Sequence, residues 1–332
     1  MIAYILRRLL HMIPTLILIS MVSFVVIQAP PGDMLTSRLA ELAEQGELGS
    51  ESAMQQIEAL RERYGLNDPI YVQYFRWIGK IIFQGDFGQS FTYEMDVMQL
   101  LGERLGLTLV LTLSTLIFTW LVAIPIGIYS ATKPYSVGDY GFTFIGFVGL
   151  ATPNFLLALV IMFIQISVFE TESVGGLLSP EYIGAEWTWG KVADLLAHIW
   201  VPVVVIGTGA TASVIRIMRG NLMDVLGQQH IQTGRAKGLK ETKVIMKYGV
   251  RIAINPLVSR LGLELPNLLS GAVVTGIVLG LPTAGPIFLT ALTSQDMFLA
   301  GAFLLLAATF LLVGNLLADI VLAWLDPRIR YE

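Results

Sequence analysis

Six long apolar runs dominate the chain, and shorter polar stretches separate them. Each run has about 20 residues or more, the length that a helix needs to cross the hydrocarbon core of a bilayer. The runs cover residues 9–27, 107–129, 142–169, 199–217, 261–281 and 298–325. The pattern predicts six transmembrane helices, and an even number of crossings places both termini on the same side.

The first run follows Arg7 and Arg8 and could be taken for a signal peptide. It is long for one, and Pro30, Pro31 and Gly32 follow it instead of a small-residue cleavage site. We therefore expect residues 1–30 to form a retained anchor helix.

The polar stretches differ in charge, and the difference predicts their sides. Residues 31–106 hold twelve acidic residues against six basic ones, and residues 171–198 hold four against one. Residues 216–260 hold nine Lys and Arg against two acidic residues. Because short cytoplasmic segments carry an excess of Lys and Arg, we expect 216–260 and both termini in the cytoplasm.

Composition supports a membrane protein: 55% of the residues are hydrophobic, only 14% are charged, and the mean hydropathy is +0.69. The sequence has no cysteine, which excludes disulfides, thiolate metal ligands and Cys nucleophiles. Its three histidines, His11, His198 and His230, are scattered and suggest no metal site.

The outer segment 31–106 has its own helical pattern. Residues 50–64 read as one helix, and Pro69 at a first helical position predicts the start of another. Tyr71, Tyr74 and Trp77 recur near helical spacing in the second helix. That helix either lies on the membrane surface or packs against neighbouring transmembrane ends.

The inner segment 220–256 reads as a helical hairpin. Residues 222–237 have helical character, Gly238 can adopt the left-handed conformation that stops a helix, and Leu239 is the apolar residue expected after such a stop. A second helix, 241–254, runs back to Pro256.

The hairpin carries small residues beside basic ones, Gly234 and Ala236 next to Arg235 and Lys237. A low-profile surface flanked by donors suits insertion into a groove on another protein. Attachment to anionic lipid would also explain the basic charge, but it leaves the glycine stop unexplained, so the pattern favours docking.

The hairpin resembles the cytoplasmic signature loop of ABC importer permeases, in the form found in the oligopeptide and dipeptide family. Similarity extends along nearly the whole chain and is typical of the first (B-type) permease of such importers. The matching segments are YILRRLLHMIP, PGD, RYGLNDPIYVQYFRW, GDFGQS, IPIG, TPNF, TGRAKGL and NLLADIVLAWLDPRIRY.

The resemblance implies an all-α polytopic membrane protein with the type I ABC importer transmembrane fold. That fold has six transmembrane helices and, here, an extracytoplasmic helical insertion after the first span. The coupling helix that enters an ATP-binding subunit would comprise Gln232, Thr233, Gly234, Arg235, Ala236, Lys237, Gly238 and Leu239.

By the same resemblance the chain is not an enzyme, and partner subunits bind ATP and Mg²⁺. The absence of a GxxxxGK[ST] phosphate loop from the sequence agrees with this. The implied partners are a second permease in a pseudo-symmetric heterodimer, two ATP-binding subunits, an extracytoplasmic solute-binding protein and membrane lipid, but no nucleic acid. The implied location is the cytoplasmic (inner) membrane of a bacterium or archaeon.

The substrate class is open between peptides and oligosaccharides. Peptide permeases usually have an acidic residue and a PGLG-like turn near the outer end of the fifth span, where this chain has Gly276 and residues 282–285. Trp187, Trp189 and Trp200 would suit sugar contact, although interfacial anchoring explains such tryptophans as well.

Two residues are candidates for lining a pathway, Asn154 and Gly276. Asn154 follows Pro153, which also predicts a simple kink; Gly276 and Gly280 also suit close helix packing. Asp319 is expected to form a structural ion pair with Arg216 or Arg219.

A self-contained secondary transporter is the competing hypothesis from another class. It predicts inverted repeats and charged residues near mid-bilayer, and the sequence displays neither. We expect an anchor helix 1–30, an insertion 31–106, a permease core 107–325 containing the coupling loop 220–256, and a tail 326–332.

Overall fold

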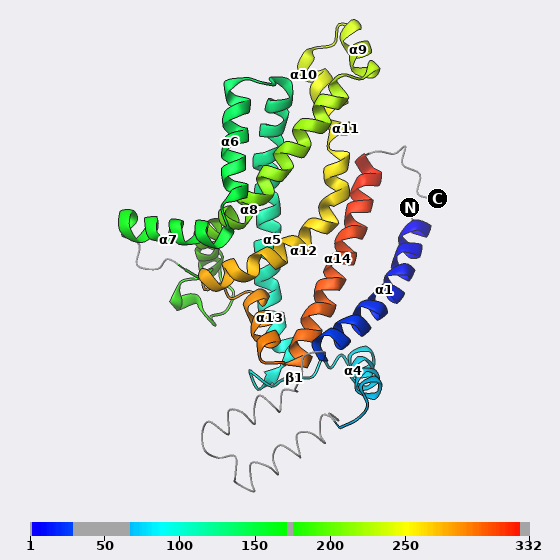
Figure 1. Cartoon of the computed structure of the whole chain (residues 1–332), viewed down its shortest axis with the longest axis vertical. Coiled ribbons are helices and arrows are strands. Elements are labelled where there is room, and N and C mark those ends of the chain that lie inside the picture. The colour runs from blue at the N-terminus through cyan, green and yellow to red at the C-terminus, as the bar shows by residue number, and fades with distance from the viewer. Residues whose placement is uncertain (1, 29–66, 171–174, 326–332) are drawn as a thin grey trace. The chain divides into compact units, whose positions relative to one another are not determined.

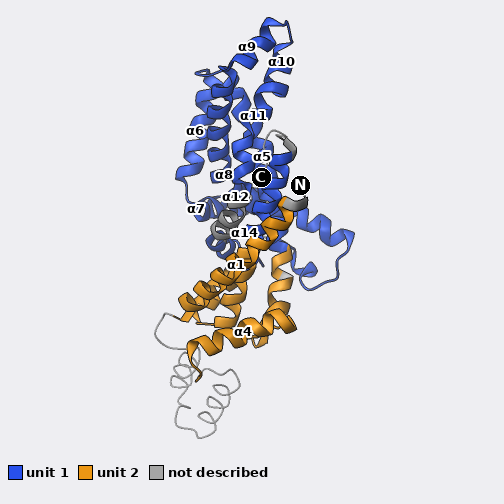
Figure 2. Cartoon of the chain, turned by 90° about the vertical axis from the view of Figure 1, so that its right-hand side faces the viewer, with its two compact units in different colours: residues 1, 107–285, 310–332 blue, residues 2–106, 286–309 orange. Residues whose placement is uncertain are grey.

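A computed structural model describes residues 2–28, 67–170 and 175–325. The chain forms two compact units, each built from separate stretches of sequence (Figure 2). One unit comprises residues 2–106 and 286–309; the other comprises 107–285 and 310–332, with Met1. The domain boundaries predicted from the sequence divide the chain into consecutive segments, whereas these units do not follow the order of the chain. Those boundaries stay a prediction.

The first unit contains α1 (Ile2–Gln28), α4 (Ile70–Gln84) and a hairpin of β1 (Gln89–Ser90) with β2 (Met95–Asp96). It also holds most of α13 (Ala284–Thr293) and the start of α14 (Met297–Leu325). Helix α4 begins after Pro69, as predicted, while the predicted helix 50–64 lies outside the described residues.

Helix α4 packs through one aromatic face against α1. Tyr74 and Trp77 are buried, and their rings lie 5.5 and 5.7 Å from the ring of Phe24. The Tyr74 hydroxyl also shares a 2.8 Å hydrogen bond with the hydroxyl of Ser20. Tyr71 on the same helix stays exposed. Of the two interpretations of this helix, packing against a transmembrane helix therefore accounts for its buried aromatic residues.

The GDFGQS segment closes onto the start of α14 through the carboxylate of Asp296. This buried carboxylate accepts hydrogen bonds from the Ser90 hydroxyl at 2.6 Å, from the backbone N–H of Phe91 at 2.9 Å and from that of Leu299 at 3.2 Å. Gly88, at φ +90°, brings the loop so near that a Cβ there would lie 2.9 Å from the ring of Phe298. The acidic residue thus caps α14 and fixes the loop at once.

The second unit is organised around α8 (Trp189–Leu226), against which α6 (Val137–Ala151), α7 (Asn154–Phe169) and α12 (Asn255–Val278) pack (Figure 1). The long helix α5 (Val97–Thr132) approaches α8 closely: a Cβ on Gly127 would lie 2.7 Å from Met218. A Cβ on Gly149 of α6 would lie 2.5 Å from Thr208. Glycine at these positions lets the helices approach more closely than any larger residue would.

Four of the six predicted spans coincide with described helices, and the third needs a correction. Four helices are long and apolar enough to cross a bilayer: α1 over Tyr4–Gln28, α5, α8, and α14 over Met297–Ala323. The predicted third span, 142–169, is not one straight helix but the pair α6 and α7, bent by 102°. If that pair is counted as one span, the described residues provide up to five membrane spans.

The bend lies at Pro153, as the kink interpretation predicted. Proline lacks an N–H and disfavours helical geometry in the residue before it, and Thr152 is accordingly extended, at φ −85° and ψ 121°. The predicted fifth span, 261–281, falls on α12, where the side chains of 262–272 lie outside the described part, so it stays a prediction.

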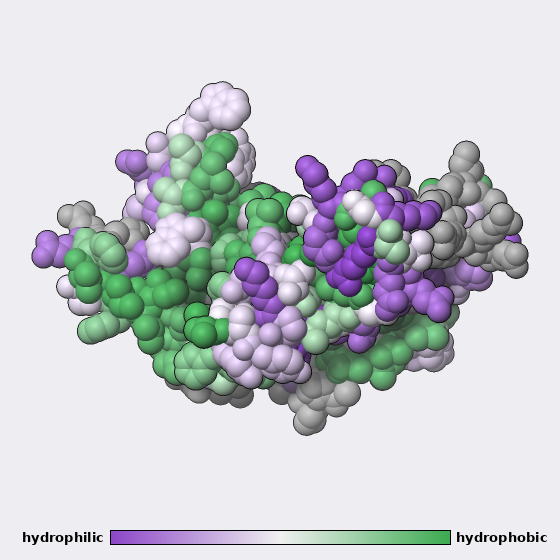
Figure 3. Space-filling model, turned by 90° about the horizontal axis from the view of Figure 1, so that it is seen from above, coloured by the Kyte–Doolittle hydropathy of each residue, from purple (hydrophilic) through white to green (hydrophobic). Residues whose placement is uncertain are grey.

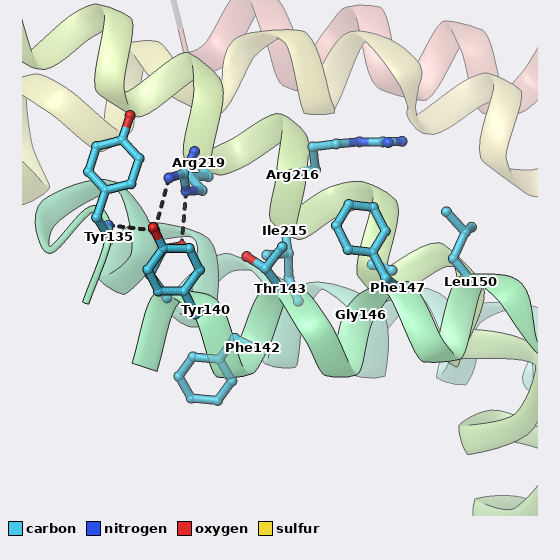
Figure 4. Close-up of a pocket in the computed structure, with 12 residues that line it drawn as sticks. Tyr135, Tyr140, Phe142, Thr143, Gly146, Phe147, Leu150, Ile215, Arg216 and Arg219 are labelled. Carbon is cyan, nitrogen blue, oxygen red and sulfur yellow. Dashed lines mark hydrogen bonds and ion pairs between the residues drawn. The ribbon is translucent and has the colours of Figure 1, made fainter. Parts of the chain in front are cut away.

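An ion pair joins the beginning of α6 to α8. Asp139 is only 3% exposed and accepts hydrogen bonds from Nε and Nη2 of Arg219 at 3.0 and 2.9 Å (Figure 4). It also accepts one from the backbone N–H of Tyr135 at 2.9 Å. Arg219 therefore pairs with Asp139 and not with Asp319, because α6 brings an acidic residue to it that is distant in sequence.

We expect Asp296→Ala to destabilise the protein by about 3 kcal/mol, because it leaves several buried donors without their charged acceptor. The thermal unfolding midpoint of the purified protein in detergent measures this effect. Glu94→Gln, an exposed change in the neighbouring turn, is the control and should leave the midpoint unchanged. Equal midpoints for Asp296→Ala and the unmutated protein would contradict the role of this carboxylate.

Candidate functional site

The inner hairpin begins where α8 ends. Helix α8 stops at Leu226, Gly227 and extended Gln228 follow, and a short helix α9 (Gln229–Ala236) starts in a new direction. The predicted single helix 222–237 is thus divided in two, which corrects that prediction. Gln228, at ψ 155°, breaks the helical path.

The end of α9 is a Schellman motif centred on Gly238. The N–H of Gly238 donates to the carbonyl of Arg235 at 2.9 Å, and the N–H of Leu239 donates to the carbonyl of Gly234 at 3.3 Å. Gly238 has φ +71°, the left-handed conformation predicted from the sequence. A Cβ here would meet no neighbouring atom within 4 Å, so only the backbone conformation demands glycine.

The second arm of the hairpin is helical from α10 (Glu241–Lys243) through a π-helical stretch, η2 (Val244–Val250), to α11 (Arg251–Ala253). The predicted second helix, 241–254, is therefore present, although its centre is wound more loosely than an α-helix. Ile254 keeps helical angles, so the arm runs directly into α12.

Apolar side chains hold the hairpin to the end of α8. Ile231 of α9, Val244 of η2 and Leu222 of α8 are each 0% exposed and belong to one core cluster. At Gly249 of η2 a Cβ would lie 3.1 Å from Leu222, which shows how closely the second arm approaches α8. The hairpin is consequently packed as part of its unit and is not a free loop.

The opposite face of the hairpin is open to solvent. Of the eight predicted coupling residues, only Gly234 and Leu239 are partly buried; the exposed ones are Gln232, Thr233, Arg235, Ala236, Lys237 and Gly238. Seen from the end of the molecule that carries α9, hydrophilic surface gathers over the hairpin (Figure 3). The described geometry thus brings the predicted residues together on one exposed tip.

One ion pair ties the two arms across this tip. Arg235 donates to Glu241 at 2.6 Å, and both side chains are about half exposed. The hydrogen bond from Arg235 lowers the pKa of Glu241 below its ordinary value, and the same bond raises the pKa of Arg235.

The two candidate pathway residues lie in different surroundings. Asn154 is partly buried at the start of α7, where its amide oxygen lies 3.9 Å from the position of a Cβ on Gly209 of α8. Gly276 is buried near the end of α12, and its carbonyl accepts the N–H of Leu281 at 2.7 Å. The structure does not bring these two residues into a common site with the hairpin, and pathway lining stays a prediction for both.

Three features of the fold were missed by sequence reasoning: Asp139 as the partner of Arg219, the Asp296 cap, and a cavity beside Arg216. A usable signal existed only for Asp296. It stands two residues before the sixth apolar run, the position at which an Asp caps a helix.

Comparison with known proteins gives consistent matches over the whole chain. Residues 123–331 match the family described as "Binding-protein-dependent transport system inner membrane component", and residues 1–112 match the N-terminal family of such membrane components. A solved structure of the MetNI methionine ABC transporter in inward-facing conformations aligns with a TM-score of 0.48 at 17% identity. The alignment covers 69% of this chain and 97% of that one.

Curated relatives match along their full lengths. The oligopeptide transport system permease protein AppB of Bacillus subtilis is 38% identical over 335 residues, covering 100% of both chains. The dipeptide transport system permease protein DppB of Alkalihalophilus pseudofirmus is 32% identical, and the glutathione transport system permease protein GsiC of Salmonella paratyphi A is 30% identical, each again with 100% coverage of both chains.

The Arg235–Glu241 pair predicts a one-sided pH dependence of hairpin order. The folded pKa of Glu241 lies below its ordinary 4.5. The ion pair therefore stabilises the ordered hairpin fully above that pH, and this stabilisation is lost as the pH falls through the lowered pKa. A spin label on Lys240→Cys, in this otherwise cysteine-free chain, should show constant mobility from about pH 8 to 5 and rising mobility at lower pH.

The same label combined with Glu241→Gln is the control. It should report higher mobility that no longer depends on pH. A transition centred above the ordinary glutamate pKa in the unmutated hairpin would contradict the lowered value.

Proposed function

Since the chain belongs to the family of inner-membrane components of binding-protein-dependent transport systems, we propose that it forms half of the translocation pathway of an ATP-driven importer of peptides. The observation that carries the proposal is full-length similarity to peptide permeases at up to 38% identity among the relatives named above. The resemblance drawn from sequence motifs is thereby confirmed, as is the all-helical, multi-pass membrane fold.

Peptides take precedence over oligosaccharides as the proposed substrate. The relatives described above are named for oligopeptides, dipeptides and glutathione. The chain departs from the usual pattern of peptide permeases near Gly276 and residues 282–285, whereas the similarity to peptide permeases covers the whole chain. The three tryptophans that would suit sugar contact are about half exposed or more, as interfacial anchors also are.

The hairpin is proposed as the element that docks into an ATP-binding subunit. Its exposed tip offers Arg235, Lys237 and the small residue Ala236, while Ile231 and Val244 anchor it from below. Because the exposed tip is held by buried side chains, a partner that displaces the tip would also displace the helices packed behind it.

The connections of the hairpin to the membrane helices determine which helices such a displacement would move. Helix α8 has 38 residues, which at about 1.5 Å per residue is roughly 57 Å, well beyond the ~30 Å of a hydrocarbon core. Its end reaches the hairpin, and the second arm continues into α12. Displacement of the tip would therefore act on two membrane helices together and alternate the access of the pathway.

The proposed assembly has three kinds of partner in addition to lipid. A second permease subunit completes the pathway as a pseudo-symmetric heterodimer, two subunits bind and hydrolyse ATP, and a solute-binding protein delivers peptides from outside. The basic charge of residues 216–260 supports a cytoplasmic hairpin and cytoplasmic termini. No catalytic role is proposed for this chain.

We expect Gly238→Val to abolish both the stimulation of ATP hydrolysis and the transport of peptide. Valine in a left-handed conformation costs roughly 1–3 kcal/mol, so the motif that ends α9 would rearrange and displace the tip. The measurement is ATP hydrolysis stimulated by peptide-loaded binding protein, with peptide uptake, in proteoliposomes that contain the whole importer. Both should fall to the unstimulated level although the complex still inserts.

Gly220→Val is the matched control, because Gly220 lies in the helical part of α8 and a Cβ there meets nothing within 4 Å. It should keep stimulation and uptake. Ala236→Trp separates docking from folding, since its side chain projects from the exposed face and should block stimulation with α9 intact. Normal stimulation in both hairpin variants would refute the coupling role, and stimulation by sugars but not peptides would refute the substrate class.

A further inference from the structure

A cavity of about 270 Å³ lies between α6 and α8, within one compact unit and away from the hairpin tip (Figure 4). Phe142, Phe147, Leu150 and Ile215 contribute apolar surface to it, and Gly146 and Ala212 leave room between them. A Cβ on Gly146 would lie 3.5 Å from that of Ala212, so the two helices are in contact at this level.

The cavity contains one cation that is neutralised and one that is not. Arg219 is held by Asp139 through two hydrogen bonds. Arg216 also lines the cavity, is exposed, and forms no ion pair with any residue in the described part of the chain. Figure 4 shows its side chain extended toward the side of Phe147, away from the Asp139–Arg219 pair. The cavity therefore has a net positive charge.

Polar and apolar groups are ordered along the cavity. Helices α6 and α8 run antiparallel, since Asp139 pairs with Arg219, Gly146 lies beside Ala212 and Gly149 lies beside Thr208. From Arg216 the lining passes through Thr143 to Phe147 and Leu150, while α8 changes from the apolar residues of the fourth run to its basic end.

We propose that this cavity binds one anionic phospholipid, with its phosphate on Arg216 and an acyl chain along Phe147 and Leu150. An exposed guanidinium at the basic end of a membrane-spanning run lies at the level where anionic lipid headgroups attract Lys and Arg, and its fork geometry matches phosphate oxygens. The apolar portion suits a chain, not a hydrated ion. The proposal is independent of which solute the importer carries.

Charge complementarity favours anionic over zwitterionic lipid. A phosphatidylcholine brings its own cation, which leaves the charge of Arg216 uncompensated, whereas phosphatidylglycerol neutralises it. Both lipids have a phosphate group, so a comparison of the two headgroups tests whether the net charge of the lipid is recognised.

The test uses the purified importer complex, equilibrated with phosphatidylglycerol and phosphatidylcholine in detergent and examined by native mass spectrometry. The unmutated complex should retain one phosphatidylglycerol in preference. Arg216→Gln should lower that preference about tenfold, the effect of losing one charged hydrogen-bond pair. Arg260→Gln removes an exposed arginine outside the cavity and should leave the preference unchanged.

A second pair of variants tests the acyl-chain portion. Phe147→Ala removes a wall of the cavity and should weaken retention of both lipids. Phe144→Ala is its matched control: both rings lie on α6 and are largely exposed, at 54% and 69%, but only Phe147 lines the cavity. Because both side chains are exposed, folding should survive either change.

A photoreactive group on Thr143→Cys identifies the occupant directly, since the chain has no cysteine of its own. Cross-linking to phosphatidylglycerol supports the proposal. Cross-linking to the second permease subunit instead would overturn it, because the cavity would then be a protein interface. Equal phosphatidylglycerol preference in Arg216→Gln and the unmutated complex would overturn it as well.

Discussion

The coupling role proposed for this protein depends on the packing of three apolar side chains at the end of α8. Leu222, Ile231 and Val244 come from α8, α9 and η2 and are all fully buried in one cluster. Without this contact the basic hairpin would be a tethered loop, and a force applied to its tip would be absorbed by backbone rotation. With it, the tip and the ends of α8 and α12 form one packed body.

The sequence predicted the features that depend on a few adjacent residues. Pro153 determines its bend through its own ring, Pro69 starts α4, and Gly238 followed by Leu239 contains all that a Schellman motif requires. Apolar runs likewise predict spans because the bilayer imposes one length on every helix that crosses it. These constraints are local or are imposed by the bilayer, so they could be predicted without knowledge of the packing.

Features set by tertiary contact were missed. Asp139 precedes Arg219 by eighty residues, and only the antiparallel packing of α6 on α8 brings them together. The break at Gly227 and Gln228 was missed, since the segment 222–237 has no proline and Gly227 keeps right-handed angles that any residue could adopt. Of the predicted site, the hairpin tip is gathered as expected, while Asn154 and Gly276 lie in separate surroundings.

The π-helical stretch of the second arm has a mechanical consequence. A π turn accommodates one more residue than an α turn, so the seven residues of η2 contain slack in their winding. If that slack were taken up, everything downstream would turn by about 100°, the angle that one residue occupies in an α-helix. Val244–Val250 is thus the place in the chain where α12 could twist by one residue without loss of its helical hydrogen bonds.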